Sequence, residues 1–331
     1  MMAKEAGGRV VSRTPDFEEP ILEIDEKIAE LKRFSASTDV NLTEQIQQLT
    51  RKSEEMKRRI FAHLTPWQRV LIARHSDRPQ ATDILDLVAE EFIELHGDRA
   101  FRDDPCILTG LARIGGRRCM VVGHRKGKTT REKLACGFGC AHPEGYRKAI
   151  QKMRLAAKLG LPVVSFIDTP GAHPGMEAEE RGQAFVIALA LKEMADLPTP
   201  IVCLILGEGG SGGALGIGVG DRILMLEHAY YSVISPEGCA AILWKDSGHA
   251  PAAAEALKLT ADDLLGLGVI DEILPEPLGG AHRDVAATAE TIKGALLRHL
   301  GEIGEAKRGD LVARRFDKFR RMGRFLENSE R

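Results

Sequence analysis

The chain has 331 residues, of which 44% are hydrophobic and 28% charged, an ordinary composition for a globular protein with one large or two average domains. Its formal net charge of −2 gives no bias towards nucleic acid or a membrane surface, so we expect neither as a partner. Residues 1–20 lack the apolar core of a signal peptide, and no apolar stretch is long enough to span a bilayer. Six scattered cysteines fit a reducing, cytoplasmic location better than a disulfide framework.

Two highly charged helices are predicted near the N-terminus, over residues 21–34 and 41–64. Their apolar residues recur at helical spacing, but the apolar stripe is narrow. Such a stripe usually needs a partner surface, either on the same chain or on another subunit. Two further helices are predicted over 67–74 and 82–95. We therefore assign residues 1–95 to a helical N-terminal arm that serves assembly.

Strands and helices alternate after this arm. The predicted strands are 107–114, 118–122, 162–167, 200–206, 222–226 and a short run near 229–234, and the predicted helices are 145–159, 179–194, one that begins at Gly213, and 238–244. Gly115 and Gly116 join the first two strands, which is a strong hairpin signal. The alternation is typical of βαβ units with a mostly parallel sheet. We assign 96–285 to an α/β core and 286–331 to C-terminal helices.

The most informative segment is the glycine loop 207–214, with the sequence Gly-Glu-Gly-Gly-Ser-Gly-Gly-Ala. It follows the apolar run 201–206 and leads into the helix at Gly213. Glycine permits close approach of the backbone, and the first N–H groups of a helix have no partner within it. Together these features make a pocket of backbone donors that suits a developing oxyanion. The simpler interpretation is a tight turn packed against another backbone. The two glycine pairs that flank the serine make this interpretation less favoured.

A second loop, 168–172, follows the preceding buried strand and reads Asp-Thr-Pro-Gly-Ala. In open α/β sheets, ligands bind outside the carboxyl ends of the strands. We therefore expect the two loops to lie side by side on one rim. Asp168 could act as an acid or a base there, although a role in shaping its own turn is favoured.

Ser211 is a candidate nucleophile, but its surroundings do not match the G-x-S-x-G pattern of the hydrolases. His228 and His249 follow it in the chain, and nothing in the sequence connects either of them to the serine. A serine hydrolase is therefore not favoured.

Two further patterns resemble ligand sites only in part. Residues 123–129 imitate a P-loop, but the spacer between the glycines is one residue short, so we exclude a nucleotide loop. The basic run 125–133 could contact phosphates or be a solvated surface loop. Cys136, Cys140 and His142 lie close together, but no second cysteine pair has ligand spacing, so packing is favoured and no metal site is predicted.

Six segments, taken in order, resemble the alpha subunit of bacterial acetyl-coenzyme A carboxylase carboxyltransferase. They are 145–149 (Gly-Tyr-Arg-Lys-Ala), 166–171, 178–183 (Ala-Glu-Glu-Arg-Gly-Gln), 207–214, 231–240 (Tyr-Ser-Val-Ile-Ser-Pro-Glu-Gly-Cys-Ala) and 276–283 (Glu-Pro-Leu-Gly-Gly-Ala-His-Arg). The resemblance covers nearly the whole chain. Four residues depart from the expected family pattern: His173 stands in place of a tyrosine, Cys140 in place of a methionine, and Met176-Glu177 in place of a smaller pair.

The resemblance implies a crotonase-like (ClpP-like) spiral α/β core. It implies transfer of a carboxyl group from carboxybiotin, held on a separate carrier protein, to acetyl-CoA, which gives malonyl-CoA in the first committed step of fatty acid synthesis. It also implies a beta subunit that bears zinc and completes the site in an α2β2 assembly, while biotin carboxylase carries out the ATP-dependent step. This chain lacks a four-cysteine zinc pattern, which fits the alpha role, and no covalently bound cofactor is expected.

The residues that match the family's oxyanion hole on the biotin side are Gly212 and Gly213. The expected rim of the site consists of Gly209, Gly210, Ser211, Gly171, Ala172 and His173. Valine at Gly212 or Gly213 is expected to stop carboxyl transfer and leave the fold intact, because a Cβ blocks backbone approach. The alternatives are a free-standing crotonase-like hydratase or thioester hydrolase, for which Glu208 is the one close acid, and a non-enzymatic scaffold subunit.

Overall fold

The computed structural model describes residues 15–38, 40–304 and 308–323. The chain divides between His63 and Leu64 into two compact units, and each is described here by itself. No helix within the described ranges is both long and apolar enough to cross a membrane.

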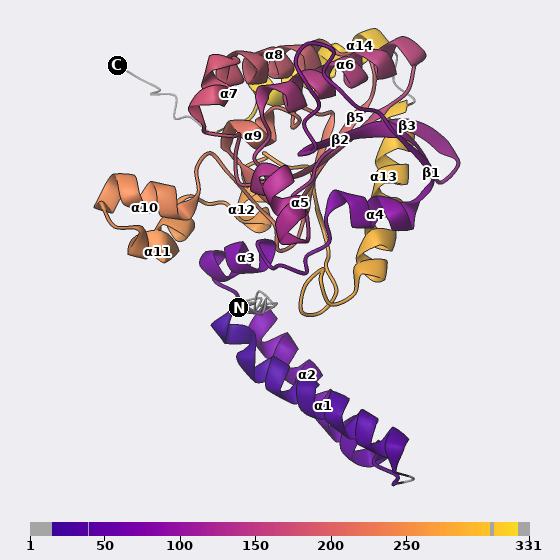
Figure 1. Cartoon of the computed structure of the whole chain (residues 1–331), viewed down its shortest axis with the longest axis vertical. Coiled ribbons are helices and arrows are strands. Elements are labelled where there is room, and N and C mark those ends of the chain that lie inside the picture. Colours follow the sequence, from indigo (N-terminus) through magenta and orange to yellow (C-terminus); the bar gives the residue numbers. More distant parts are fainter. Residues whose placement is uncertain (1–14, 39, 305–307, 324–331) are drawn as a thin grey trace, which may run out of the picture. The chain divides into compact units, whose positions relative to one another are not determined.

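The first unit is a pair of helices. After a short 3₁₀ turn, η1 (Asp16–Glu18), the chain forms α1 (Glu19–Ser37) and α2 (Thr43–Phe61), which run side by side in Figure 1. Asp25 on α1 connects them, because its carboxylate accepts a hydrogen bond from Ser53 Oγ at 2.6 Å and lies 3.0 Å from Lys57 Nζ. The two charged helices predicted from the sequence are therefore confirmed, to within a few residues at each end.

The second unit is built on one mixed sheet. Its strands are β1 (Ala89–Glu94), β2 (Ile107–Ile114), β3 (Arg117–His124), β4 (Val163–Thr169), β5 (Ile201–Gly210), β6 (Arg222–Leu226), β7 (Tyr230–Ser232) and β8 (Glu272–Leu274). Within the described residues their order is β1-β2-β3-β4-β5-β6-β8, with β7 paired to the end of β5. Strands β1 to β3 are antiparallel, whereas β3, β4, β5, β6 and β8 run parallel. The predicted parallel core is confirmed, with an antiparallel hairpin at one edge.

Helices cover both faces of this sheet. They are α3 (Pro66–Ala73), α4 (Ala81–Val88), α5 (Thr130–Ala135), α6 (Pro143–Leu159), α7 (Met176–Glu180), α8 (Gln183–Asp196), α9 (Ser211–Leu215), α10 (Pro236–Trp244), α11 (Ala250–Ala256), α12 (Ala261–Gly266), α13 (Val285–Gly304) and α14 (Arg308–Arg320), with 3₁₀ turns η2 (Gly137–Gly139) and η3 (Ser247–His249). Helices α6 and α8 pack together on one side, and α4 and α13 on the other (Figure 1). Every residue of β4 and β5 is buried, as expected for parallel strands covered on both faces.

Three predicted elements differ from the structure. The helix predicted over 82–95 is α4 followed by β1, because residues 89–94 pair with β2 and this edge pairing overrides their helical spacing. The helix predicted over 179–194 is broken at Gly182, whose φ of 81° lies in the left-handed region. Strand β5 continues beyond residue 206 to Gly210, because its last residues pair with β7.

The C-terminal helices are confirmed as far as Arg320, and residues 324–331 lie outside the described part of the chain. Arg315 of α14 is buried against the core. Its guanidinium donates to the carboxylate of Asp221 at 2.8 Å and to the backbone carbonyls of Met194, Leu197 and Thr199 at 2.6–2.8 Å. Helix α14 is thus anchored to the end of α8 by a fully paired arginine.

Candidate functional site

A cavity of about 590 Å³ lies at the carboxyl ends of β4 and β5. Its lining includes five of the residues predicted for the site, namely Gly171, Ala172 and His173 after β4, and Ser211 and Gly212 after β5. The two loops therefore share one rim, as the sequence predicts.

The other three predicted glycines, Gly209, Gly210 and Gly213, lie behind this wall and outside the cavity lining. A Cβ on Gly210 would stand 2.1 Å from the carbonyl oxygen of Pro170, and one on Gly213 would stand 2.5 Å from the backbone nitrogen of Ala172. Both glycines are required because the two loops touch backbone to backbone. The expectation that valine at Gly213 leaves the fold intact is therefore wrong.

Gly212 is different because it has room for a Cβ. The nearest atom to an added Cβ is on Ile187, at 3.7 Å. The preceding Ser211 is exposed and has a φ of 51°, a left-handed conformation that is uncommon for a residue with a side chain. This turn begins α9 at the cavity wall, and the first N–H groups of a helix have no partner within it. The wall at Gly212 can therefore present backbone donors to an anionic oxygen.

Sequence reasoning missed the opposite wall of the cavity. Glu179 and Gln183 line it, as do the apolar Ile187 and residues 233–235. Gln183 is held in place, since its side-chain nitrogen donates to the carbonyl of Ala141 at 2.7 Å and to that of His173 at 3.2 Å. The sequence did contain a signal for this wall, because segments 178–183 and 231–240 are two of the six that carry the family resemblance.

A buried network of charges lies behind the loops and holds Glu208. The Glu208 carboxylate lies 2.8 Å from Lys126 Nζ and 2.7 Å from Arg74 Nε, and it accepts a hydrogen bond from the Tyr230 hydroxyl at 2.7 Å. Burial alone would raise its pKa, but the charges of Lys126 and Arg74 outweigh burial and lower the pKa of Glu208 to about 2. Glu208 is a permanent anion outside the cavity lining, which makes it unsuited to act as a base there.

Asp168 belongs to the same network rather than to a turn of its own. Its Oδ1 accepts a hydrogen bond from the backbone N–H of Glu208 at 2.9 Å and lies 2.6 Å from Lys126 Nζ. Lys126 therefore bridges the ends of β4 and β5, from which the two loops begin. The preference for a local turn at Asp168 was wrong, because the sequence did not show that Lys126 would lie between the two strands.

The segment that imitates a P-loop has a structural role. His124 is fully buried, and burial lowers its pKa to about 3. Lys126 belongs to the buried network around Glu208, whereas Arg125 pairs with Glu94 and Lys128 pairs with Asp83. The basic run therefore has much of its charge neutralised by neighbouring carboxylates.

The cysteines predicted to serve packing are buried or half-buried thiols. Burial raises the pKa of both Cys136 and Cys140, which keeps them protonated at neutral pH. Among the described residues, neither cysteine belongs to a group of potential metal ligands.

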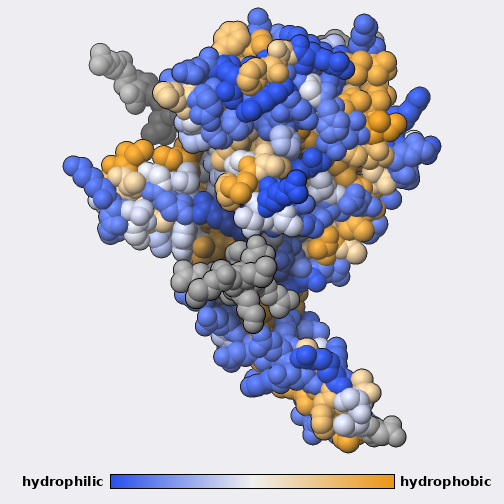
Figure 2. Space-filling view, viewed as in Figure 1, coloured by the Kyte–Doolittle hydropathy of each residue, from blue (hydrophilic) through white to orange (hydrophobic). Residues whose placement is uncertain are grey.

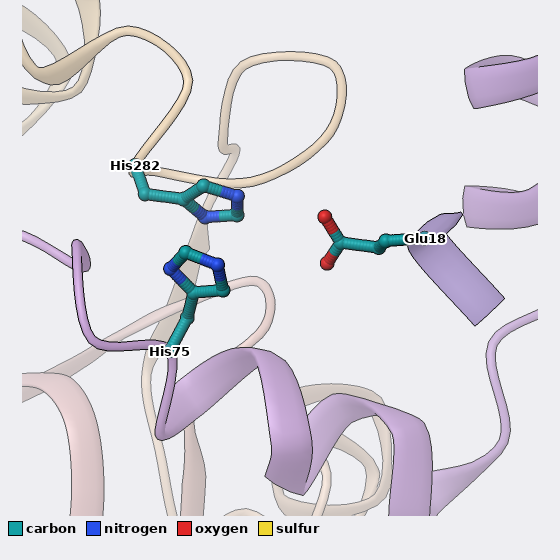
Figure 3. A group of neighbouring side chains, drawn as sticks. All are labelled: Glu18, His75 and His282. Atoms are coloured by element: carbon teal, nitrogen blue, oxygen red, sulfur yellow. The ribbon is translucent and has the colours of Figure 1, made fainter. Parts of the chain in front are cut away.

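Segment 276–283, another part of the resemblance, is fixed to the end of α3. The imidazoles of His75 and His282 stack with ring centroids 4.0 Å apart (Figure 3). Nearby, the buried Arg78 donates to Glu276 at 2.6 Å. These contacts give the motif a structural role, because they join segment 276–283 to the residues that follow α3.

An apolar surface lies next to the cavity. A second hollow of about 430 Å³ shares Ser211, Gly212 and Val233 with the first and is otherwise lined mainly by apolar side chains. Hydrophobic side chains also gather on the surface of α10 (Figure 2), where Ile242 and Leu243 are exposed, and Val233 just before this helix is 78% exposed. The cavity thus opens beside an apolar surface of the kind that marks protein interfaces.

The architecture is that of the crotonase-like carboxyltransferases. Solved structures with this fold include the beta subunit of Pseudomonas aeruginosa geranyl-CoA carboxylase (TM-score 0.52, 18% identity, covering 72% of this chain and 45% of that one). A Pseudomonas malonate decarboxylase hetero-tetramer in complex with coenzyme A is similar (TM-score 0.54, 16% identity, 64% and 84% covered). Transcarboxylase 12S also matches (TM-score 0.51, 17% identity), and the chain spans less than half of its length, 42%. At these identities the likeness concerns the fold.

The sequence identifies the family. Residues 14–323 match the family described as acetyl co-enzyme A carboxylase carboxyltransferase-like, and the chain belongs to it. Among its relatives, the acetyl-coenzyme A carboxylase carboxyl transferase subunit alpha of Rhodopirellula baltica is 52% identical, with 95% of this chain and 98% of that protein covered. The subunit alpha of Thermus thermophilus is 53% identical, with 94% and 99% covered.

Proposed function

We propose that this chain is the alpha subunit of a biotin-dependent carboxyltransferase, which moves a carboxyl group from carboxybiotin on a carrier protein to acetyl-CoA and so produces malonyl-CoA. The C–N bond between the carboxyl group and biotin breaks, a C–C bond to the methyl carbon of acetyl-CoA forms, and the methyl proton passes to the biotin nitrogen. Negative charge develops on oxygen atoms of both reactants. Backbone N–H groups that are already positioned to donate to these oxygens stabilise the transition state and so lower the barrier to carboxyl transfer.

One observation carries this proposal: Gly212 lies in the first turn of α9 on the wall of a cavity and has no side chain to keep a ligand away from its backbone. The cavity of about 590 Å³ is within the usual size range for small-molecule sites and can hold a bicyclic ring system such as biotin. Gly213, Gly209 and Gly210 support the site by letting the loop lie against residues 169–172 and β7. Gly171, Ala172 and His173 line the same cavity.

The main alternative, a free-standing hydratase or thioester hydrolase, required Glu208 as its acid or base. That residue is buried, paired with two cations and outside the cavity lining. Glu179 does line the cavity, but its side chain is exposed to solvent. The geometry therefore favours a site that works through backbone donors and a second subunit.

Alone, this chain is expected to show no carboxyl transfer, because the acetyl-CoA side of the site is assigned to a beta subunit in an α2β2 assembly. The apolar surface beside the cavity is the feature that supports such a partner. The measurement is the conversion of malonyl-CoA and biotin to acetyl-CoA, with the chain alone and after addition of a beta subunit from a relative. Robust turnover by the chain alone would favour a self-contained enzyme, and no turnover by a verified complex would refute the proposal.

Deletion of residues 1–63 is expected to weaken association with the beta subunit while the α/β unit still folds. We infer an assembly role for α1 and α2, because both helices are highly charged and carry only narrow apolar stripes. Such helices gain most of their stability from packing. Sedimentation velocity with the beta subunit measures the complex, and circular dichroism of the truncated chain controls for folding. If the complex keeps its size and affinity, the arm is dispensable for assembly.

The same proposal implies three features beyond this chain: a separate biotin carrier protein, a biotin carboxylase for the ATP-dependent step, and zinc confined to the beta subunit. It also implies a cytoplasmic location. This location is supported by the six cysteines, all of which are free thiols.

A further inference from the structure

Three potential metal ligands meet at the edge of the cavity, although the sequence predicted no metal here. His142 is the last residue before α6, His173 lies in the loop after β4, and Glu177 is in the first turn of α7. One ligand atom from each of the three lies within 4.8 Å of the other two. We propose that His142, His173 and Glu177 bind a divalent transition metal ion of the zinc type.

The distances are close to those of an occupied site. Oε1 of Glu177 lies 3.9 Å from Nε2 of His142 and 3.7 Å from Nδ1 of His173. Nitrogen and oxygen ligands stand about 2.0–2.2 Å from zinc, so neighbouring ligand atoms of a tetrahedral site are about 3.3–3.5 Å apart. A contraction of roughly half an ångström therefore brings the carboxylate oxygen into range of both imidazoles.

The two imidazoles are already held together. Their rings stack with centroids 3.9 Å apart and planes inclined by 20°. The backbone fixes this pair, since the N–H of His173 donates to the carbonyl of Ala141 at 3.0 Å and the N–H of His142 donates to Asp104 at 2.8 Å. The backbone of both ligands is therefore fixed, and the metal would have to tilt one ring out of the stack, because an ion binds along the in-plane lone pair of each imidazole.

His173 offers a ring nitrogen that can bind a metal. Its Nδ1 accepts a hydrogen bond from the N–H of Gly175 at 3.1 Å, so this nitrogen carries a lone pair, and the metal would replace that hydrogen bond. Imidazole together with one carboxylate is a donor set typical of zinc and unsuited to magnesium.

Gly175 leaves the space in which the ligands converge. Its φ of −71° is open to any residue, so its conformation does not require glycine. A Cβ at this position would stand 2.6 Å from a carboxylate oxygen of Glu177 and 2.7 Å from Cε1 of His173.

A bound metal would link the start of α6, the loop after β4 and α7. His173 and Gly175 both line the cavity, so the ion would fix one of its walls. With a side chain that is 53% exposed, Glu177 leaves the site open to ions from solvent.

The test is a Zn²⁺ titration of the full chain against a chromophoric chelator, with the number of tightly bound equivalents measured by elemental analysis. Three variants are compared with the wild type: His173→Tyr, Glu177→Gln and, as the matched control, His249→Gln, which alters an exposed histidine 3.9 Å from Asp246. We expect the two site variants to lose one equivalent, or to bind it at least about 10-fold more weakly, a loss that second-shell changes already reach. The control should match the wild type, Mg²⁺ should not compete, and Zn²⁺ should raise the Tm only of the wild type and the control.

Equal stoichiometry and affinity in all four proteins would overturn the metal site, as would effective competition by Mg²⁺. Circular dichroism of each variant without metal shows whether it is folded, and Glu177→Gln, a change in an exposed side chain, keeps the test valid if His173→Tyr fails to fold. The measurement needs neither biotin nor a beta subunit, so its outcome is independent of the proposed carboxyl transfer.

Discussion

Valine in place of Gly212 is expected to reduce carboxyl transfer by a factor of about 10²–10³, the usual cost of losing one oxyanion donor. An added Cβ here would make an ordinary van der Waals contact with Ile187 at 3.7 Å, so we expect valine to occupy the space in front of the backbone without disturbing the fold. The reduction should appear in kcat for malonyl-CoA decarboxylation by the complete α2β2 assembly. Complex formation and the Tm should stay close to those of the wild type.

The matched control is Gly294→Val, which places the same side chain on a helical glycine whose added Cβ would meet no atom within 4 Å and which is exposed on α13. This control accounts for the general cost of replacing a helical glycine by valine. A folded, assembled Gly212→Val enzyme with near-normal kcat would show that the backbone at Gly212 does not contact the reacting oxygens.

Gly212 and Gly213 illustrate which features of the site could be predicted from the sequence and which could not. The loop, its position after a buried strand and its place on a shared rim with 171–173 were all predictable, because the carboxyl ends of parallel strands meet at one edge. Which glycine faces the cavity and which one touches Gly171 and Ala172 depends on how α9 turns after Ser211. That turn is set by contact between two loops, about which the sequence pattern carries no information.

The failures elsewhere have the same physical origin. Residues 89–94 form an edge strand because β2 lies beside them, although their spacing suits a helix. The opposite wall of the cavity, with Glu179 and Gln183, comes from a helix pair whose break at Gly182 was not predicted. Local patterns predicted most elements and the class of site, while features created by long-range contact needed the structure.

Replacing Lys126 with methionine is expected to lower the free energy of unfolding by about 3–5 kcal/mol at neutral pH, the usual cost of removing one partner from a buried ion pair. Lys126 Nζ lies 2.6 Å from Asp168 and 2.8 Å from Glu208, and both carboxylates are largely buried. Without the ammonium group, Glu208 keeps its ion pair with Arg74, whereas Asp168 keeps the hydrogen bond from the backbone N–H of Glu208. Urea-induced unfolding of the wild-type and variant chains measures the difference.

The loss should shrink as the pH falls. In the folded wild type the pKa of Glu208 is about 2, below its ordinary value of 4.5, so its ion pairs stabilise the fold above that ordinary value. This stabilisation is lost as the pH falls through about 2. In Lys126→Met the Glu208 carboxylate lacks one of its two cations and takes up its proton at a higher pH, which removes part of the unpaired charge. The unfolding free energies of the two proteins should therefore be closer at about pH 3, within the range from 4.5 to about 2 in which Glu208 titrates, than at pH 7.

Lys128→Met is the matched control, because Lys128 is two residues away and pairs with Asp83 at the surface, with 61% of its side chain exposed. Exposed ion pairs contribute about 0–1 kcal/mol, so this variant should be nearly as stable as the wild type and show little dependence on pH. The double variant Lys126→Met/Glu208→Gln, which removes one of the unpaired anions, should recover part of the loss. If Lys126→Met is no less stable than Lys128→Met, or if its loss is the same at both pH values, the bridge between β4 and β5 contributes nothing to the stability of the loops that carry the site.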